Sequence, residues 1–145
     1  AKGSIKRYAF TLGNPDAAKI HIFESAIDAL SYMTLVKHNG QIPDDLYLSL
    51  DGTAISPLDN WLQRHSGADT IIVHTDNDDA GKHALDNIIE RFGCRRKVID
   101  ARLTAHKDVN EFLLASLEKH QKTKQKPLKT NIISCIEAAL KLLKA

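Results

Sequence analysis

The sequence predicts an α/β fold with a mainly parallel sheet of about four strands flanked by helices. Two observations lead to this prediction. Short apolar runs alternate along the chain with segments whose apolar residues recur at helical spacing. Acidic residues follow two of these runs, at strand-to-helix turns, where open α/β sheets place their binding sites. Repeated units of this kind imply parallel strands joined by right-handed crossovers.

The composition is typical of one globular domain. The chain has 145 residues, of which 43% are hydrophobic and 26% charged, and this is enough for a modest core. The net charge of +2 results from 20 basic and 18 acidic residues, so it neither requires nor excludes a nucleic-acid partner. No apolar stretch approaches the roughly 20 residues that span a bilayer, and the first residues lack the apolar core of a signal peptide. We therefore expect a cytoplasmic protein with no membrane partner.

Zinc and disulfide chemistry are not indicated. Cys94 and Cys135 are far apart, and neither has the spacing to a second cysteine or a histidine that a zinc site needs. This usage fits a reducing cytoplasm. His21, His74 and His83 are scattered as well, and His21 alternates with strand residues, so we expect it to pack within the fold or to face solvent.

The first half of the chain contains two predicted strand and helix units. Residues 20–23 form an apolar run, and Ser25 is placed to cap a helix that ends near an Asn-Gly turn. The apolar run at residues 46–50 leads to a Ser-Pro pair at residues 56–57, a common helix start. Ahead of both units, residues 7–12 alternate weakly and end at a turn, which predicts an edge strand or an extended lead-in.

Two further units follow. Residues 70–73 are the next apolar run, and the helix after it is predicted to begin near Ala80 and to end at Gly93. Residues 97–101 are expected to form another strand, and residues 109–117 another helix.

The C-terminal part changes in composition. It is rich in lysine with little to bury until a last segment, where apolar residues return at helical spacing and predict an amphipathic helix. The apolar face of that helix needs a partner surface, either its own domain or another chain. We therefore divide the chain into a lead-in at residues 1–17, an α/β domain at 18–117, and a basic linker with a C-terminal helix at 118–145. The apolar stripe consists of Ile132, Ile133, Ile136, Ala139, Leu140 and Leu143.

An acidic turn follows the third run. Asp76 and Asp78 are two residues apart, so their side chains can share one side of an extended segment and bind one hard cation. Mg²⁺ is favoured because it binds through one or two carboxylates and keeps waters for a phosphate substrate. A calcium EF-hand loop is unlikely because, counted from Asp76, Asn87 stands at the twelfth position, where Glu is required. The alternative is that these residues only turn the chain and cap the next helix.

Glu24 favours the metal interpretation. It ends a strand that is expected to be central, so its carboxylate either caps the next helix or faces the ligand crevice. Asp28 lies four residues on, on nearly the same helix face, and Asp108 follows the fourth strand as part of the same rim or as a helix cap. Carboxylates that share a crevice raise one another's pKa and oppose folding, so a bound cation explains their convergence better than chance.

Taken in order, the motifs are Phe23-Glu24-Ser25-Ala26-Ile27-Asp28, Gly52-Thr53, Asp76-x-Asp78-x-Ala80-Gly81 and Lys107-Asp108-x-Asn110-Glu111-Phe112-Leu113. This order resembles the Toprim domain, a Rossmann-like fold shared by bacterial primases, type IA and type II topoisomerases, recombination-repair proteins and certain nucleases. The resemblance covers residues 18–117 and is closest to primase-like members. The residues ahead of the core are similar to Toprim modules of larger plasmid and transposon proteins.

The resemblance implies Mg²⁺-dependent phosphoryl or nucleotidyl transfer on nucleic acid, with Mn²⁺ as a substitute for Mg²⁺. Asn110 stands where primases often carry a further acid, and this departure weakens the second metal site. The roles that the resemblance implies are general acid or base for Glu24, Mg²⁺ ligands for Asp76 and Asp78, and support of a second ion for Asp28 and Asp108.

Basic residues near the acids are expected to bind phosphates. Lys82 opens the helix after the acidic turn and Lys107 precedes Asp108, although an ordinary surface lysine is the alternative at either position. The lysine-rich segment would add salt-dependent affinity for nucleic acid. The implied partners are a single-stranded DNA template or primer, nucleotides, and flanking domains or replication proteins.

Three functions remain open. The first is a primase-like module of a mobile-element or replication protein, the second a Mg²⁺-dependent Toprim nuclease, and the third a non-catalytic Toprim module that binds nucleic acid or protein. Topoisomerase activity is less favoured, because its active-site tyrosine normally belongs to a separate domain.

Overall fold

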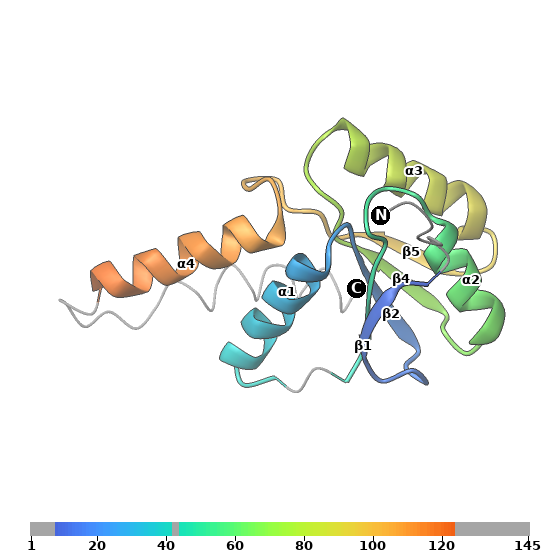
Figure 1. Cartoon of the computed structure of the whole chain (residues 1–145), viewed down its shortest axis with the longest axis horizontal. Coiled ribbons are helices and arrows are strands. Elements are labelled where there is room, and N and C mark those ends of the chain that lie inside the picture. Colours follow the sequence, from blue (N-terminus) through green and yellow to red (C-terminus); the bar gives the residue numbers. More distant parts are fainter. Residues whose placement is uncertain (1–7, 42–43, 124–145) are drawn as a thin grey trace, which may run out of the picture.

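A computed structural model of the protein describes residues 8–41 and 44–123 (Figure 1). In this part of the chain, five strands form one sheet in the order β1-β3-β2-β4-β5. The strands are β1 (Phe10–Gly13), β2 (Lys19–Phe23), β3 (Leu46–Ser49), β4 (Thr70–Val73) and β5 (Lys97–Asp100). The helices are α1 (Ala26–His38), α2 (Ser56–Arg64), α3 (Asp79–Phe92) and α4 (Val109–Thr123).

The predicted parallel sheet is confirmed, and it has one strand more than expected. Strands β3, β2, β4 and β5 pair in parallel, with Ile22 of β2 opposite Leu48 on one side and Val73 on the other. Strand β1 pairs antiparallel with β3, so the segment expected as an edge strand or a lead-in forms an edge strand. Its alternation is weak because most of its residues are exposed.

Helices cover both faces of the sheet. Helix α1 lies against one face, with α4 packed beside it and running away from the sheet, and α2 and α3 cover the other face (Figure 1). The larger core lies under α2 and α3, where Trp61 and Ile88 pack against strand residues such as Ile22. The smaller core lies under α1 and α4 and includes Phe23 and Tyr47. Burial on both faces explains why β2 and β4 read as nearly continuous apolar runs.

The helix starts follow their local signals. Ser25 caps α1 by accepting a hydrogen bond from the Asp28 backbone N–H at 3.2 Å. Helix α4 continues past the predicted end at residue 117 to Thr123, because no glycine or proline interrupts it. The predicted helix at residues 132–143 lies outside the described residues. No helix in the described ranges is both long and apolar enough to cross a membrane.

Two histidines are buried beside the smaller core. The Nδ1 atom of His21 lies 2.8 Å from Nε2 of His74, and Nε2 of His21 lies 3.1 Å from Oδ2 of Asp45. The rings of His74 and Phe23 stack, as do those of His21 and Tyr47. Of the two expectations for His21, packing within the fold is the correct one, since the residue is 3% exposed.

Acid is expected to weaken the fold through His74. Burial holds the pKa of His74 well below its usual 6.5 in the folded protein, with the neighbouring His21 as a second cause. The unfolded chain therefore binds more protons below pH 6.5, and the free energy of unfolding should fall by up to about 1.4 kcal/mol per pH unit there. Urea titrations between pH 7.5 and 5.5 measure this slope. The slope should flatten in His74→Gln and persist in His83→Gln, whose histidine is exposed; equal slopes in both variants would contradict the assignment.

Candidate active site

The candidate site lies at the carboxyl ends of β2 and β4, which are neighbours in the sheet. Glu24 follows β2 directly, and Asp76 follows β4 after two buried residues. The Oε1 atom of Glu24 accepts a hydrogen bond from the backbone N–H of Asp76 at 3.1 Å. Two segments far apart in sequence thus place their acidic residues side by side, at the edge where parallel sheets bind ligands.

The turn after β3 supports the backbone of Glu24. The carbonyl of Glu24 accepts hydrogen bonds from the Gly52 N–H at 2.9 Å and from Ser49 Oγ at 3.3 Å. Asp51 and Gly52 have φ angles of 55° and 121°, a left-handed turn that glycine adopts without strain. This geometry explains the Gly52-Thr53 motif after the second predicted strand.

Gly81 lets the acidic turn approach α3. A Cβ atom on Gly81 would lie 2.1 Å from the backbone oxygen of Asp76, so a larger residue does not fit without a shift of the backbone. Thr75 Oγ1 donates to the Gly81 carbonyl at 2.9 Å, and Asp78 Oδ1 accepts from the Gly81 N–H at 2.9 Å. The Asp-x-Asp-x-Ala-Gly motif is therefore a tightly packed turn, in which Asp78 also caps α3.

The loop before α4 lies beside this turn. Asn77 donates its backbone N–H to the Lys107 carbonyl at 2.7 Å and its side-chain amide to the Thr104 carbonyl at 3.3 Å. These bonds bring the Lys107 ammonium to 3.3 Å from Oδ2 of Asp76. The Lys107 side chain is 63% exposed, so it reaches the acids from the solvent side.

Burial and mutual repulsion disfavour the ionised acids. The pKa of Glu24 is raised, first by burial and then by the charges of Asp76 and Asp78, although the Asp76 N–H and Lys107 act against this. The pKa of Asp76 is also raised by burial, with Asp28 and Asp108 adding to the effect, while Lys107 opposes it. The pKa of Lys107 is raised by its contact with Asp76. The Lys107 ammonium thus does not fully balance the acids.

Asp28 connects α1 to α4. Its carboxylate accepts hydrogen bonds from Ser25 Oγ at 2.5 Å and from the backbone N–H of Asn110 at 3.2 Å. The residue is 6% exposed and contributes to the raised pKa of Asp76. Asp28 thus lies close to the acidic turn, while its oxygens hold the start of α4.

Asp108 and Asn110 are engaged at the start of α4. Asp108 Oδ1 accepts from the Glu111 N–H at 2.7 Å, and the Glu111 carboxylate accepts from the Lys107 N–H at 2.5 Å. Asn110, which stands where primases often carry a further acid, accepts a hydrogen bond at Oδ1 from Ser31 Oγ at 3.2 Å. Of the two roles predicted for Asp108, part of the acidic rim or a helix cap, the structure thus shows the helix cap.

Not all of the predicted site residues contact one another directly. Glu24, Asp76 and Lys107 do, whereas Lys82 is exposed on the first turn of α3 and, within the described part of the chain, forms no ion pair with these acids. Among residues 8–41 and 44–123, no three histidine, cysteine, aspartate or glutamate side chains are arranged to hold a metal ion together. The metal site stays a prediction.

Sequence reasoning did not assign the residues that hold the acids in place. Ser25 orients Asp28, and Asn77 ties the acidic turn to the loop before α4. Two local signals point to such partners. Ser25 stands three residues before Asp28, and Asp108 three before Glu111, which is the spacing of helix capping boxes. The Asn77 contact has no local signal, because its partner is 27 residues away.

Comparisons with known proteins agree with the fold. A family model described as Toprim-like matches residues 21–113. An uncharacterized Bacillus anthracis protein, pXO2-78/BXB0107/GBAA_pXO2_0107, is 31% identical over 93 residues, which is 61% of this chain and 26% of that protein. The chain thus spans about a quarter of the length of this relative.

Two solved structures share the architecture. The primase fragment of the bacteriophage T7 primase-helicase protein matches with a TM-score of 0.53 and 24% identity, covering 73% of this chain and 43% of that one. The T7 lagging-strand DNA polymerase complex with primase domains bound to an RNA/DNA hybrid and dTTP matches with a TM-score of 0.52 and 23% identity, covering 71% and 50%. The strand order, the acidic strand ends and the matched residues 21–113 show that the chain belongs to the Toprim-like family, with a primase-like fold.

Proposed function

We propose that the chain carries out Mg²⁺-dependent nucleotidyl transfer on nucleic acid, as a primase-like Toprim module of a replication or mobile-element protein. The observation that carries this proposal is the contact between Glu24 and the Asp76 backbone at the ends of two adjacent parallel strands. Such an edge is the usual ligand site of an open α/β sheet. Here it combines a half-buried, protonatable carboxylate with further acids.

The chemistry of these acids fits a magnesium ion. Glu24, Asp76 and Asp78 offer carboxylate oxygens, which Mg²⁺ prefers. The pKa of Glu24 and that of Asp76 are both raised, so an added positive charge would stabilise their ionised forms. The Lys107 ammonium, which pairs with Asp76, already supplies part of this positive charge. Bound Mg²⁺ would neutralise charge on the reacting phosphate. Asp28 and Asp108, which hold the start of α4, would support a second ion mainly through their charge.

Glu24 is proposed as the general acid or base. Its pKa is raised by burial and by neighbouring carboxylates. This brings the pKa closer to neutral pH, and a general acid or base is most effective when its pKa lies near the working pH. The Asp76 N–H holds one oxygen of Glu24 in place. The carboxyl would therefore take the proton of a sugar hydroxyl from a fixed position.

Lys107 and Lys82 are proposed to bind substrate phosphates. Lys107 is exposed and already pairs with an acid, so it can exchange Asp76 for a phosphate when a cation neutralises the carboxylate. Lys82 lies on the first turn of α3, where the helix dipole also attracts anions.

The substrate class comes from the relatives. The T7 primase domains, which share the fold, are bound to an RNA/DNA hybrid and dTTP in the complex described above. A nucleic-acid template with nucleotides is therefore the proposed substrate, and flanking domains or replication proteins are the proposed partners. We place the module in the cytoplasm, where replication proteins work.

Replacing Asp76 by Asn tests the metal site within this chain. The variant should lose binding of Mn²⁺, because it removes a charged ligand and the partner of Lys107. Electron paramagnetic resonance of free Mn²⁺ measures the affinity, and primer synthesis on single-stranded DNA with Mg²⁺ and nucleotides measures activity. Asp86→Asn is the matched control, since Asp86 is an exposed aspartate on α3; it should retain both properties.

Other outcomes of these two assays would favour a different function or overturn the site. Template degradation that requires Mg²⁺ would favour the nuclease over the primase. Mn²⁺ binding by the native chain without either activity would favour the binding module or a need for flanking domains. Equal Mn²⁺ affinity of the native chain and Asp76→Asn would overturn the proposed site.

A further inference from the structure

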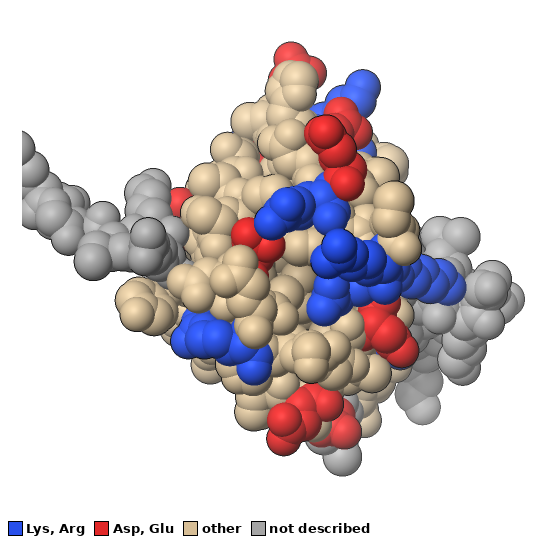
Figure 2. All heavy atoms as spheres, turned by 90° about the vertical axis from the view of Figure 1, so that its right-hand side faces the viewer, with Lys and Arg blue, Asp and Glu red and all other residues tan. Residues whose placement is uncertain are grey.

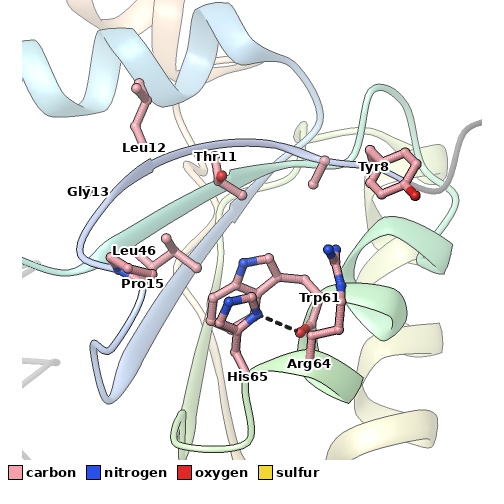
Figure 3. A pocket seen from close by; sticks show the side chains of 10 residues that line it. Tyr8, Thr11, Leu12, Gly13, Pro15, Leu46, Trp61, Arg64 and His65 are labelled. Carbon is pink, nitrogen blue, oxygen red and sulfur yellow. Dashed lines mark hydrogen bonds between the residues drawn. The ribbon is translucent and has the colours of Figure 1, made fainter.

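A pocket of about 370 Å³ opens between the edge strand β1 and helix α2 (Figure 3). It lies on the face of the sheet covered by α2 and α3, apart from the acids described above. Its size is at the lower end of the range for small-molecule pockets, about 300–1,000 Å³. The lining residues on the β1 side precede the range matched by the family model, whereas those on the α2 side lie within it. The residues on the β1 side are Tyr8, Ala9, Thr11, Leu12, Gly13 and Pro15.

The wall on the α2 side is aromatic. The rings of Trp61 and His65 stack with their centroids 4.2 Å apart and an angle of 10° between their planes. His65 Nδ1 lies 3.1 Å from the Trp61 carbonyl and donates to it, which fixes the orientation of the imidazole. The ring of Tyr8 lies near the other end of the pocket and is 71% exposed (Figure 3). Trp61 is only 5% exposed and the His65 ring covers one face of its indole, so the half-buried His65 ring and the exposed Tyr8 ring are the flat surfaces available to an aromatic ligand.

The charge of the pocket is positive. Arg64 lines it, with its Cζ atom 5.7 Å from the centre of the Tyr8 ring. Among the described lining residues none is acidic, and Arg64 is the one arginine or lysine. The pocket therefore favours a flat ligand that carries a single negative charge.

We propose that this pocket binds one unpaired nucleotide of a single-stranded nucleic acid, with its base against the aromatic wall and its phosphodiester at Arg64. A phosphodiester carries one negative charge, which one guanidinium balances. A free nucleoside triphosphate carries several charges and would need more cations than the pocket offers. This role is independent of catalysis at Glu24.

The neighbouring surface continues the basic character. Arg91 of α3 reaches Asp59 of α2, with Nη2 3.3 Å from Oδ2, so the two helices lie side by side. Lys97 is exposed at the start of β5. Figure 2 shows lysine and arginine side chains gathered on the side of the molecule where α2 and α3 lie. A strand that leaves the pocket has positive charge available on this side.

Trp61 reports on the pocket directly, because it is the single tryptophan of the chain. Titration with a twelve-nucleotide oligothymidylate should quench its fluorescence, and the midpoint gives the affinity. Arg64→Gln should weaken binding about tenfold and lower the slope of log affinity against log salt by about 0.7–1. Arg64 is exposed, so the substitution should leave the fold intact.

Two matched variants separate the possible outcomes. Arg95→Gln removes an equally exposed arginine away from the pocket and should change the affinity less than about twofold. Asp86→Asn, the control for the metal site, should likewise leave the quenching unchanged. Absence of quenching, equal losses in Arg64→Gln and Arg95→Gln, or equal affinity for thymidine monophosphate alone would each overturn the proposal.

Discussion

Replacing Glu24 with glutamine is expected to slow nucleotidyl transfer by roughly 10²–10⁴-fold while leaving the fold at least as stable as the native one. The rate should fall because the amide does not ionise near neutral pH and so cannot act as a general acid or base. Stability should not fall, because the amide oxygen can still accept the hydrogen bond from the Asp76 N–H. The burial and the neighbouring acids that raise the pKa of Glu24 make its ionised form unfavourable in the folded protein, and glutamine removes that charge.

The sign of this effect follows from the direction of the pKa shift. A carboxyl whose folded pKa lies above the usual 4.5 destabilises the fold at neutral pH, and this cost disappears as the pH falls through the raised pKa. Urea unfolding in EDTA at pH 7 should therefore give a midpoint for Glu24→Gln equal to or above that of the native chain. Glu90→Gln, on the exposed side of α3, should keep both activity and stability. Full primer synthesis by Glu24→Gln would remove Glu24 from the mechanism.

Replacing Gly81 with alanine is expected to destabilise the fold by roughly 2–4 kcal/mol and to weaken metal binding at the same time. The added methyl group would lie 2.1 Å from the Asp76 carbonyl oxygen. That oxygen belongs to the backbone, so no side-chain rotation relieves the contact. The acidic turn or the first turn of α3 must move, and Asp76 and Asp78 move with it.

Gly67→Ala provides the matched control for this prediction. A Cβ atom at Gly67 meets no other heavy atom within 4 Å. Its substitution should therefore change the free energy of unfolding by less than about 0.5 kcal/mol. Urea titration measures both variants, and Mn²⁺ titration of the folded Gly81→Ala chain measures its metal affinity. A Gly81→Ala variant as stable as Gly67→Ala would show that the turn has more freedom than the packing indicates.

The two substitutions test groups with opposite effects on the stability of the fold. Glu24 and Asp76 are unfavourable for the stability of the fold, since burial and repulsion raise the pKa of each. Gly81 and the caps made by Asp78 and Asp108 stabilise the turns that hold those acids together. Functional sites often combine strained or repelling groups with a well-packed support.

Local patterns along the chain were enough to place most elements of the fold. Apolar periodicity placed β2, β4 and β5 almost to the residue, and Ser25 marked the start of α1, because these signals act between residues close together in the chain. The edge strand β1 was less certain, since its exposed residues leave only a weak pattern. The order of the acidic motifs was sufficient to indicate the Toprim resemblance.

The contacts of the acidic side chains, in contrast, depend on how distant segments pack together. Asp28 meets the Asn110 backbone across 82 residues, and Glu24 meets Asp76 across 52. Such contacts depend on how strands and helices pack, and no local spacing encodes them. The same holds for the pocket between β1 and α2, whose aromatic and basic residues come from two separate segments. Local physics thus specified the elements, and packing between distant segments decided which side chains meet.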